Sequence, residues 1–342
     1  MDKMKAVGLR RYLPIDRAEA LLDLELPWPE PGPHDLLVRV QAVSVNPVDT
    51  KVRAPKDKIE DPPRVLGWDA AGIVERVGDK VSLFRPGDAV YYAGDITRPG
   101  CNAQLHCVDE RIVGRKPATL DFAQAAALPL TAITAYEALF DRLGVALDGR
   151  DAGRSLLIIG AAGGVGSIAI QLAALAGLAV IATAGRQESR DWVLAQGAQY
   201  VVDHHQPLRP QLEALGFAQL DFIANFHDTD RYWDVTADLI APQGRIVTIV
   251  ENQGPLAQAT LKNKSATHVW EFMFTRPMYQ TPDQEAQHLL LTRVADWIDT
   301  GKLRHTLTRR LSPICAERLR EAHAQLESGT MIGKLVVEGW AF

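Results

Sequence analysis

The feature that most constrains the fold of this chain is a glycine-rich turn directly after a run of apolar residues. Residues 156–167 read LLIIGAAGGVGS: an apolar strand, a turn of small residues and the start of a helix. Small residues are required in such a turn because the backbone must approach a pyrophosphate and the helix must pack closely on the strand. The alternative is a packing turn without a ligand. The pattern G-x-G-x-x-G predicts a dinucleotide site formed by Ala161 at the first glycine position, Gly163, Gly164, Val165 and Gly166.

The residues after the second predicted strand, 180–183, indicate which dinucleotide would bind. Sites that prefer NAD usually hold an aspartate or glutamate there on the ribose hydroxyls. Here Gly185 and Arg186 follow the strand, and Arg190 stands one helical turn later. Arginine can recognise a 2′-phosphate by charge-assisted hydrogen bonds. The pattern favours NADPH over NADH; the alternative is that both arginines are solvated charges at a helix start.

Apolar strands alternate with helical segments through the middle of the chain. The predicted strands are 155–160, 180–183, 200–202, 221–226 and 245–250. This alternation predicts a parallel sheet covered by helices on both faces. Asn225 and His227 end the fourth strand at the edge where open α/β sheets bind ligands. Both are therefore candidate ligand contacts, and the alternative for His227 is an exposed loop residue.

The two ends of the chain have a different pattern. Residues 35–45, 72–77, 89–93 and 104–108 are short strands separated by turn signals, and the alternation in the first of them is typical of a half-buried antiparallel sheet. Beyond Thr275 only two helices, 287–300 and 316–328, and a last strand, 333–337, remain. The length of 342 residues matches about two domains at roughly 150 residues each. We predict an α/β protein with a β-rich domain from 1–128 and 275–342 and a doubly wound parallel-sheet domain from 129–274.

Composition and charge exclude several functional classes. The formal charge of −5 leaves no excess of Lys and Arg to neutralise a phosphate backbone, so nucleic acid is not the expected partner. Three cysteines, an odd number, suit a reducing compartment. The charged N-terminal residues do not resemble a secretory signal. The nearly uncharged segment 156–185 could span a bilayer, but its glycines divide it into strand, turn, helix and strand. We expect a cytoplasmic protein without membrane association.

Three segments together resemble the medium-chain dehydrogenase/reductase superfamily along nearly the whole chain. They are VLGWDAAGIVERVGDKVSLFRPGDAVYY at 65–92, ALPLTAITAYEAL at 127–139 and IIGAAGGVG at 158–166. SVNPVDTK at 44–51 and GKLVV at 333–337 resemble its quinone oxidoreductase branch and the set often labelled zinc-type alcohol dehydrogenase-like. The resemblance implies a GroES-like catalytic domain built from both chain ends, an inserted Rossmann NADP(H)-binding domain, and an active site in the cleft between them.

Zinc members of the superfamily place a cysteine, a histidine and a second cysteine around a catalytic metal, and this chain departs at each matching place. Asn46 and Trp68 stand at the first two, and no cysteine lies near Leu130. Catalytic zinc needs three protein ligands of nitrogen, sulfur or carboxylate type. The four-cysteine structural lobe of those relatives has no counterpart either. We expect no catalytic zinc, and the alternative donor set is Asp49, Asp69, His106 and Cys107, whose spacing matches no recognised metal motif.

Without a metal, the chemistry should suit electrophiles that accept hydride readily, such as quinones and α,β-unsaturated carbonyls. By resemblance, Asn46 holds the first site position of the quinone oxidoreductases, and Lys51 replaces the tyrosine that often sits five residues on. We expect Asn46 and Lys51 to donate hydrogen bonds to the developing oxyanion, and Trp68 to form an aromatic wall against a flat quinone. The alternatives are a solvated Lys51 and core packing for Trp68.

The resemblance also implies further coenzyme contacts and a dimer. It places Thr131 near the nicotinamide, His204 against the adenosine phosphate, and Lys334 of the GKLVV motif in the coenzyme site. The apolar run at 267–274 resembles an edge strand through which relatives form dimers. We therefore expect a homodimeric, NADPH-dependent oxidoreductase that reduces quinones or α,β-unsaturated carbonyls. A zinc-dependent alcohol dehydrogenase and an NADPH-binding sensor or structural protein are the alternatives.

Overall fold

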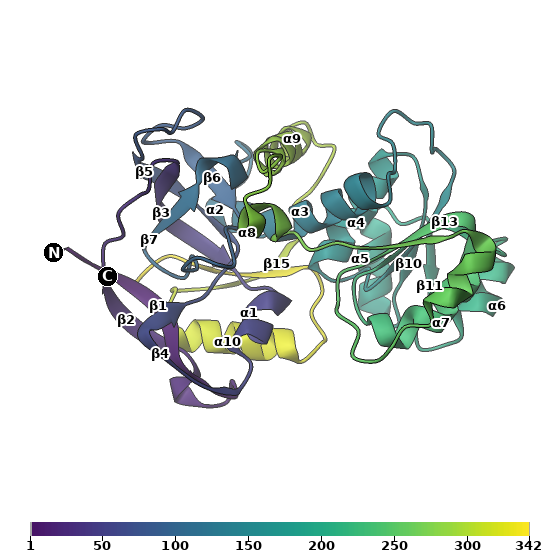
Figure 1. Ribbon diagram of the computed structural model, residues 1–342, viewed down its shortest axis with the longest axis horizontal. Coiled ribbons are helices and arrows are strands. Elements are labelled where there is room, and N and C mark those ends of the chain that lie inside the picture. Colours follow the sequence, from purple (N-terminus) through teal and green to yellow (C-terminus); the bar gives the residue numbers. More distant parts are fainter. Residues whose placement is uncertain (1, 342) are drawn as a thin grey trace. The chain divides into compact units, whose positions relative to one another are not determined.

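The structure is a computed structural model that describes residues 2–341, and these residues form two compact units (Figure 1). The first unit contains residues 2–130 and 274–341, and the second contains residues 131–273. The sequence places the two boundaries after residues 128 and 274, one or two residues away from those of the structure. The first unit is built mainly of antiparallel strands and the second of parallel strands, and the predicted α/β class is confirmed.

Two sheets form the first unit. One has three strands in the order β2-β1-β4; the other runs β15-β16-β3-β5-β6-β8, with β7 also paired to β3. Most of β3 is buried rather than half-buried, because it lies inside its sheet between β5 on one edge and β7 and β16 on the other. The strands are β1 (Lys3–Tyr12), β2 (Leu22–Pro27), β3 (Asp35–Ser44), β4 (Lys56–Val65), β5 (Ala70–Val77), β6 (Ala89–Tyr92), β7 (Leu105–Asp109), β8 (Val113–Arg115), β15 (Leu307–Leu311) and β16 (Lys334–Glu338).

The C-terminal segment completes this unit. Val337 in β16 pairs with Val43 in β3, so the last strand extends a sheet begun some three hundred residues earlier. Helix α9 packs on β8, and α10 packs on β16 and α1. The helices are α1 (Pro47–Arg53), α2 (Phe122–Ala126), α8 (Thr275–Tyr279), α9 (Ala286–Asp299) and α10 (Ala316–Glu327), with 3-10 turns at Ala18–Ala20 and Glu110–Ile112.

The second unit is a parallel sheet in the order β11-β10-β9-β12-β13-β14. Its strands are β9 (Ser155–Ile159), β10 (Ala179–Thr183), β11 (Tyr200–Val202), β12 (Leu220–Asn225), β13 (Ile240–Thr248) and β14 (Thr267–Trp270). Its helices are α3 (Pro129–Tyr136), which begins at the boundary, α4 (Gly164–Leu175), α5 (Gln187–Gln196), α6 (Leu208–Ala214) and α7 (Thr229–Leu239), with a π-helical turn at Glu137–Arg142 and a 3-10 turn at Gln258–Lys264.

Both faces of this sheet are covered, which explains its apolar strands. Leu157 and Ile159 of β9 pack in a core cluster with side chains of α6 and α7. Leu156 and Ile158 alternate with them, so they face the other side, where α4 packs on β9 and β10. The uncharged segment 156–185 thus forms β9, α4 and β10, as predicted. In the described part of the chain, no helix has the length and hydrophobicity that a bilayer crossing requires.

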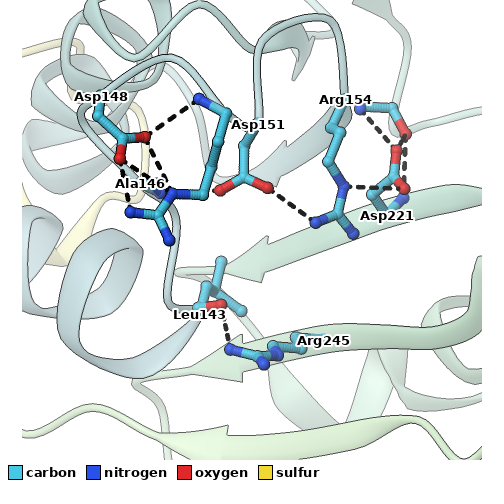
Figure 2. Close-up of polar contacts among 9 residues, drawn as sticks. Leu143, Ala146, Asp148, Asp151, Arg154, Asp221 and Arg245 are labelled. Carbon is cyan, nitrogen blue, oxygen red and sulfur yellow. Dashed lines mark hydrogen bonds and ion pairs between the residues drawn. The ribbon is translucent and has the colours of Figure 1, made fainter.

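The amino edge of the sheet is fixed by a polar network in the loop before β9 (Figure 2). Asp151 accepts hydrogen bonds from the N–H of Ala146 and from Arg154, both at 2.9 Å. Arg154 also donates to Asp221, which accepts the N–H of Ser155 at 2.9 Å. The starts of β9 and β12 are therefore tied together.

Candidate active site

The glycine-rich turn lies between β9 and α4, at the carboxyl edge of the parallel sheet. Gly160 has φ +78°, a conformation that favours glycine. A Cβ at Gly166 would lie 2.4 Å from the carbonyl oxygen of Gly160 and 2.6 Å from the Cα of Ala161, so only glycine lets α4 pack this close. No side chain within residues 2–341 caps the start of α4, and its first turn carries no acid. The N–H groups and the positive end of the helix dipole are therefore available to an anion.

The end of β10 carries the groups that would meet the adenosine ribose. A Cβ on Gly185 would lie 2.3 Å from the ring of His205, so this ring covers the glycine. Arg190, on α5, donates to the carbonyl oxygen of Ala184 at 3.3 Å, which holds its guanidinium beside the strand end. The carboxylate of Asp203 also approaches Gly185, and it accepts the N–H of His205 at 2.9 Å. This edge thus combines arginine, imidazole and one carboxylate.

His204 carries an unsatisfied ring nitrogen at the same edge. Its ring lies 4.3 Å from that of His205, and its carbonyl oxygen accepts a 3.5 Å hydrogen bond from Arg231. Its Nδ1 is buried and has no hydrogen-bond partner among residues 2–341. Burial and the neighbouring His205 lower its pKa, which favours a neutral ring. A buried ring nitrogen of this kind is completed by a ligand or a water.

Asn225 and His227 occupy the turn after β12. Asn225 is buried; its side-chain amide donates to the carbonyl oxygen of Asp228 at 2.8 Å, and its Oδ1 accepts the N–H of His227 at 3.0 Å. Asn225 therefore shapes the turn. His227 is exposed, and its Cβ lies 3.3 Å from where a side chain on Gly160 would begin, so the histidine adjoins the glycine-rich turn.

The first unit buries a polar cluster around Asn46, at the start of α1. The Asn46 side-chain amide donates to Asp69 at 3.0 Å, and its N–H donates to Asp49 at 2.7 Å. Lys334, the first residue of β16, donates to the Asn46 side-chain oxygen at 2.5 Å and pairs with Asp69 at 3.3 Å. The second oxygen of Asp69 accepts the N–H of Leu130 at 3.0 Å. The structure thus brings Asn46 and Lys334, two of the predicted site residues, into direct contact.

The charges of this cluster are poorly solvated. Asp49 and Asp69 are both 0% exposed, and Lys334 is 3% exposed. Burial raises the pKa of Asp49 to about 7 and that of Asp69 to about 6, while the Lys334 ammonium acts to lower both. Burial lowers the pKa of Lys334, against the pull of the two carboxylates. One ammonium therefore faces two buried acids, and burial favours the protonated form of each acid.

Four other predicted residues lie elsewhere in the two units. Lys51 is exposed on α1, and Arg186 is exposed at the start of α5. Trp68 is 1% exposed; its indole N–H donates to the carbonyl oxygen of Asp95 at 3.3 Å, and its ring meets that of Phe274 edge to face. These contacts match the core-packing alternative for Trp68. Thr131 is buried on α3.

The described residues do not fit a catalytic zinc. Among residues 2–341, no group of three or more His, Cys, Asp or Glu could hold a metal ion. His106, from the alternative donor set, shares its ring nitrogens with the Tyr92 hydroxyl at 3.1 Å and the Pro99 carbonyl oxygen at 2.9 Å. Burial lowers its pKa to about 4 and raises the pKa of the Cys107 thiol to about 12, so Cys107 holds its proton. A nicotinamide dinucleotide fits better: the second unit offers a glycine cradle, an uncapped helix start and the unpartnered His204 nitrogen.

Sequence reasoning missed His205 and Asp203, which lie beside Gly185 at the end of β10, and the ion pair between Lys334 and Asp69. His205 could have been considered because it follows His204, already singled out. Asp69 and Lys334 each interrupt an apolar run, LGWDAAG and GKLVV, and opposite charges in two apolar segments are a signal of a buried ion pair.

Family models match both parts of the chain. The Alcohol dehydrogenase GroES-like domain matches residues 32–127, and the Zinc-binding dehydrogenase family matches residues 196–337. The zinc-type alcohol dehydrogenase-like protein of Staphylococcus epidermidis is 41% identical over 98% of this chain and 99% of its own length. The 2-methylene-furan-3-one reductase of Solanum lycopersicum is 30% identical over 98% of this chain and 79% of its own length.

Solved structures agree with this placement. A protein from Rhizobium etli CFN 42, described provisionally as a zinc-dependent alcohol dehydrogenase, is 52% identical with a TM-score of 0.95 and full coverage of both chains. The quinone oxidoreductase of Coxiella burnetii is 26% identical with a TM-score of 0.80, over 98% of this chain and 99% of its own.

Proposed function

We propose that this chain, which belongs to the quinone oxidoreductase-like branch of the medium-chain dehydrogenase/reductase superfamily, is an NADPH-dependent reductase of quinones or α,β-unsaturated carbonyls that works without catalytic zinc. The observation that carries the proposal is the cluster around Asn46: a lysine ammonium and two carboxylates are buried there, and no set of three metal-binding side chains is found within residues 2–341. The names of the tomato and Coxiella relatives, an enone reductase and a quinone oxidoreductase, support the substrate class.

The coenzyme would be held by the second unit. The turn at 160–166 would receive the pyrophosphate through backbone N–H groups at the start of α4. Arg186 and Arg190 would meet the 2′-phosphate, and His204 would give its unpartnered nitrogen to the adenosine phosphate. Asp203 opposes this preference through its negative charge, but its carboxylate is already engaged by the N–H of His205. When bound, NADPH supplies a hydride to a conjugated acceptor.

The chain's own contribution to the chemistry is to stabilise the oxyanion that forms on the acceptor. We assign this to the Asn46 side-chain N–H whose hydrogen bond to the Ser44 carbonyl oxygen is long, at 3.4 Å, while Asp69 holds the other N–H at 3.0 Å, and to the exposed ammonium of Lys51. A fixed donor needs no reorganisation during the reaction, which is the main advantage of a protein site over water. Quinones and enones need no stronger polarisation than this, whereas simple aldehydes do.

The first test mixes chelator-treated protein with NADPH or NADH and an ortho-quinone, an enone or a simple aldehyde. Loss of the reduced-nicotinamide absorbance is followed. We expect NADPH-dependent turnover of the quinone or enone. Tight NADPH binding without turnover would favour a sensor, and aldehyde reduction that appears only with added zinc would favour the zinc enzyme.

We also propose a homodimer that pairs through β14. This strand is an edge of the parallel sheet, so one row of its backbone groups has no neighbouring strand in the described chain. Trp270 and Phe272, at its end, are 43% and 44% exposed. Exposed apolar side chains beside an unpaired strand favour pairing with a second copy.

A further inference from the structure

The Lys334 ammonium has no hydrogen left for a ligand. An ammonium group offers three N–H donors. Those of Lys334 point to the carbonyl oxygen of Val45 at 2.8 Å, the Asn46 side-chain oxygen at 2.5 Å and the Asp69 carboxylate at 3.3 Å. All three partners belong to the first unit and are buried. Lys334 therefore acts on its neighbours rather than on a coenzyme phosphate.

This contact decides which way the Asn46 amide faces. The Asn46 oxygen must point to the ammonium, because the ammonium can only donate. The amide nitrogen then points to the carboxylate of Asp69 at 3.0 Å and to the carbonyl oxygen of Ser44 at 3.4 Å. Rotating the amide by half a turn would place its N–H groups against the ammonium and its oxygen against the carboxylate. Both contacts would be repulsive, so Lys334 and Asp69 together permit one orientation.

The ammonium also occupies the place where a cation would be bound. A divalent cation on the same oxygens of Asn46 and Asp69 would need them within about 2.0–2.6 Å. The ammonium already lies between these oxygens and is covalently part of the chain. Asp69 links the three places at which zinc relatives are expected to bind metal. It follows Trp68 in the sequence and accepts hydrogen bonds from the Asn46 side chain and from the N–H of Leu130.

We propose that Lys334 is a built-in substitute for a catalytic divalent cation: it supplies the fixed positive charge beside Asp69 and sets the direction of the Asn46 amide. Lys334 is a positioning residue, and its second role rests on the proposed function, in which Asn46 donates to the oxyanion. The first role does not depend on the substrate: the Lys334 ammonium supplies the positive charge beside Asp69 and thereby excludes a metal ion from this place.

The activity arm compares Lys334→Met with the double variant Lys334→Met/Asp69→Asn. The single variant leaves buried carboxylates without their cation, so we expect its Tm to fall by about 5–10 °C. The double variant removes the unpaired charge and should recover most of this loss. If Lys334 directs Asn46, both variants keep the wild-type Kd for NADPH but lose kcat on the quinone or enone by roughly 10–100-fold, the range for losing a preorganised donor. If both kcat and Tm recover in the double variant, Lys334 only neutralises the charge of Asp69, and the positioning role is wrong.

The metal arm does not depend on turnover. Wild-type protein is incubated with excess zinc, dialysed, and analysed by inductively coupled plasma mass spectrometry beside Asp69→Asn. We expect less than one tenth of a zinc per chain in both. If the wild type binds one zinc per chain and Asp69→Asn does not, the proposal that the Lys334 ammonium takes the place of a metal is wrong. A wild-type protein that is free of zinc yet inactive on every acceptor would instead refute the proposed function and leave the ammonium as the resident cation.

Discussion

The proposed preference for NADPH rests on single side chains at the end of β10. Arg190 is held beside the strand end by its bond to Ala184, whereas Arg150 sits in the loop at the opposite edge of the same sheet and pairs with Asp148. If Arg190 meets the 2′-phosphate, Arg190→Ala should weaken NADPH binding by about 10–100-fold, equivalent to a charged hydrogen bond of roughly 1.5–3 kcal/mol, and leave NADH binding unchanged. Fluorescence titration measures both constants. Arg150→Ala is the matched control, and equal losses for the two coenzymes would remove Arg190 from the phosphate site.

A second single residue, Glu271, makes stability depend on pH. It is 2% exposed, and burial, with repulsion from Glu137 and a hydrogen bond that the protonated Glu271 donates to Glu137, raises its pKa from 4.5 to about 9, although Arg142 donates to it at 2.8 Å. Between these pH values the folded state holds a proton that the unfolded state has lost, so stability falls as pH rises. Glu271→Gln should match the wild type near pH 5 and be the more stable protein at pH 9, by more than about 1 kcal/mol, the equivalent of roughly one pKa unit.

Urea unfolding at pH 5, 7 and 9 measures this effect. The control is Glu213→Gln, which changes an exposed glutamate on α6 that pairs with Arg209. An exposed pair contributes at most about 1 kcal/mol, so the control should show no comparable rise in relative stability. If Glu271→Gln is destabilised equally at all three pH values, Glu271 is ionised in the folded protein.

At the residue scale, sequence predicts what is local and misses what is joined across the chain. The glycine-rich turn is one continuous segment, residues 160–166, and the need for small residues in it follows from the strand and helix directly beside it in the sequence. Lys334 meets Asn46 across 288 residues of sequence, so nothing near either residue indicates the contact. His205 was missed for a related reason, because its position depends on the path of the loop after β11, which brings its ring against Gly185.

At the element scale, the packing of α4 against the turn is the critical contact. Gly166→Ala would place a methyl group 2.4 Å from the carbonyl oxygen of Gly160, so α4 must shift; overpacking of this kind costs about 1–3 kcal/mol. We expect a lower Tm and at least tenfold weaker NADPH binding, since the shift moves the N–H groups that we propose bind the phosphates. Gly254→Ala is the control, because it lies outside the glycine-rich turn and its Cβ would meet only a carboxylate oxygen of Asp230, at 3.4 Å. Calorimetry measures the Tm and titration measures the Kd for NADPH. If both variants change these quantities equally, close packing is not the reason for glycine at position 166.

One strand that sequence analysis did not predict has a sequence unlike that of a buried strand. β4 reads KDKIEDPPRV, with charges and two prolines. Prolines and charges are tolerated on an edge strand, and β4 is an edge of the three-stranded sheet. The parallel strands were predicted because helices cover both faces and make their sequences apolar. Burial on both faces leaves a pattern in sequence, and an edge position does not.

At the scale of the whole molecule, the open edge at β14 makes the assembly testable. Trp270→Lys places a charge on an exposed apolar position at the end of that strand, and charged edges oppose strand pairing. We expect the wild type to sediment at twice the mass of the chain and the variant to dissociate at least tenfold more readily. Leu289→Lys is the matched control: it changes a 59% exposed leucine on α9, in the first unit, and should leave the mass unchanged. Because an edge strand that pairs is also protected, the wild-type N–H groups of β14 should exchange more slowly at high protein concentration than at low. A wild-type protein that is monomeric at micromolar concentration, with exchange independent of concentration, would show that this edge is left open.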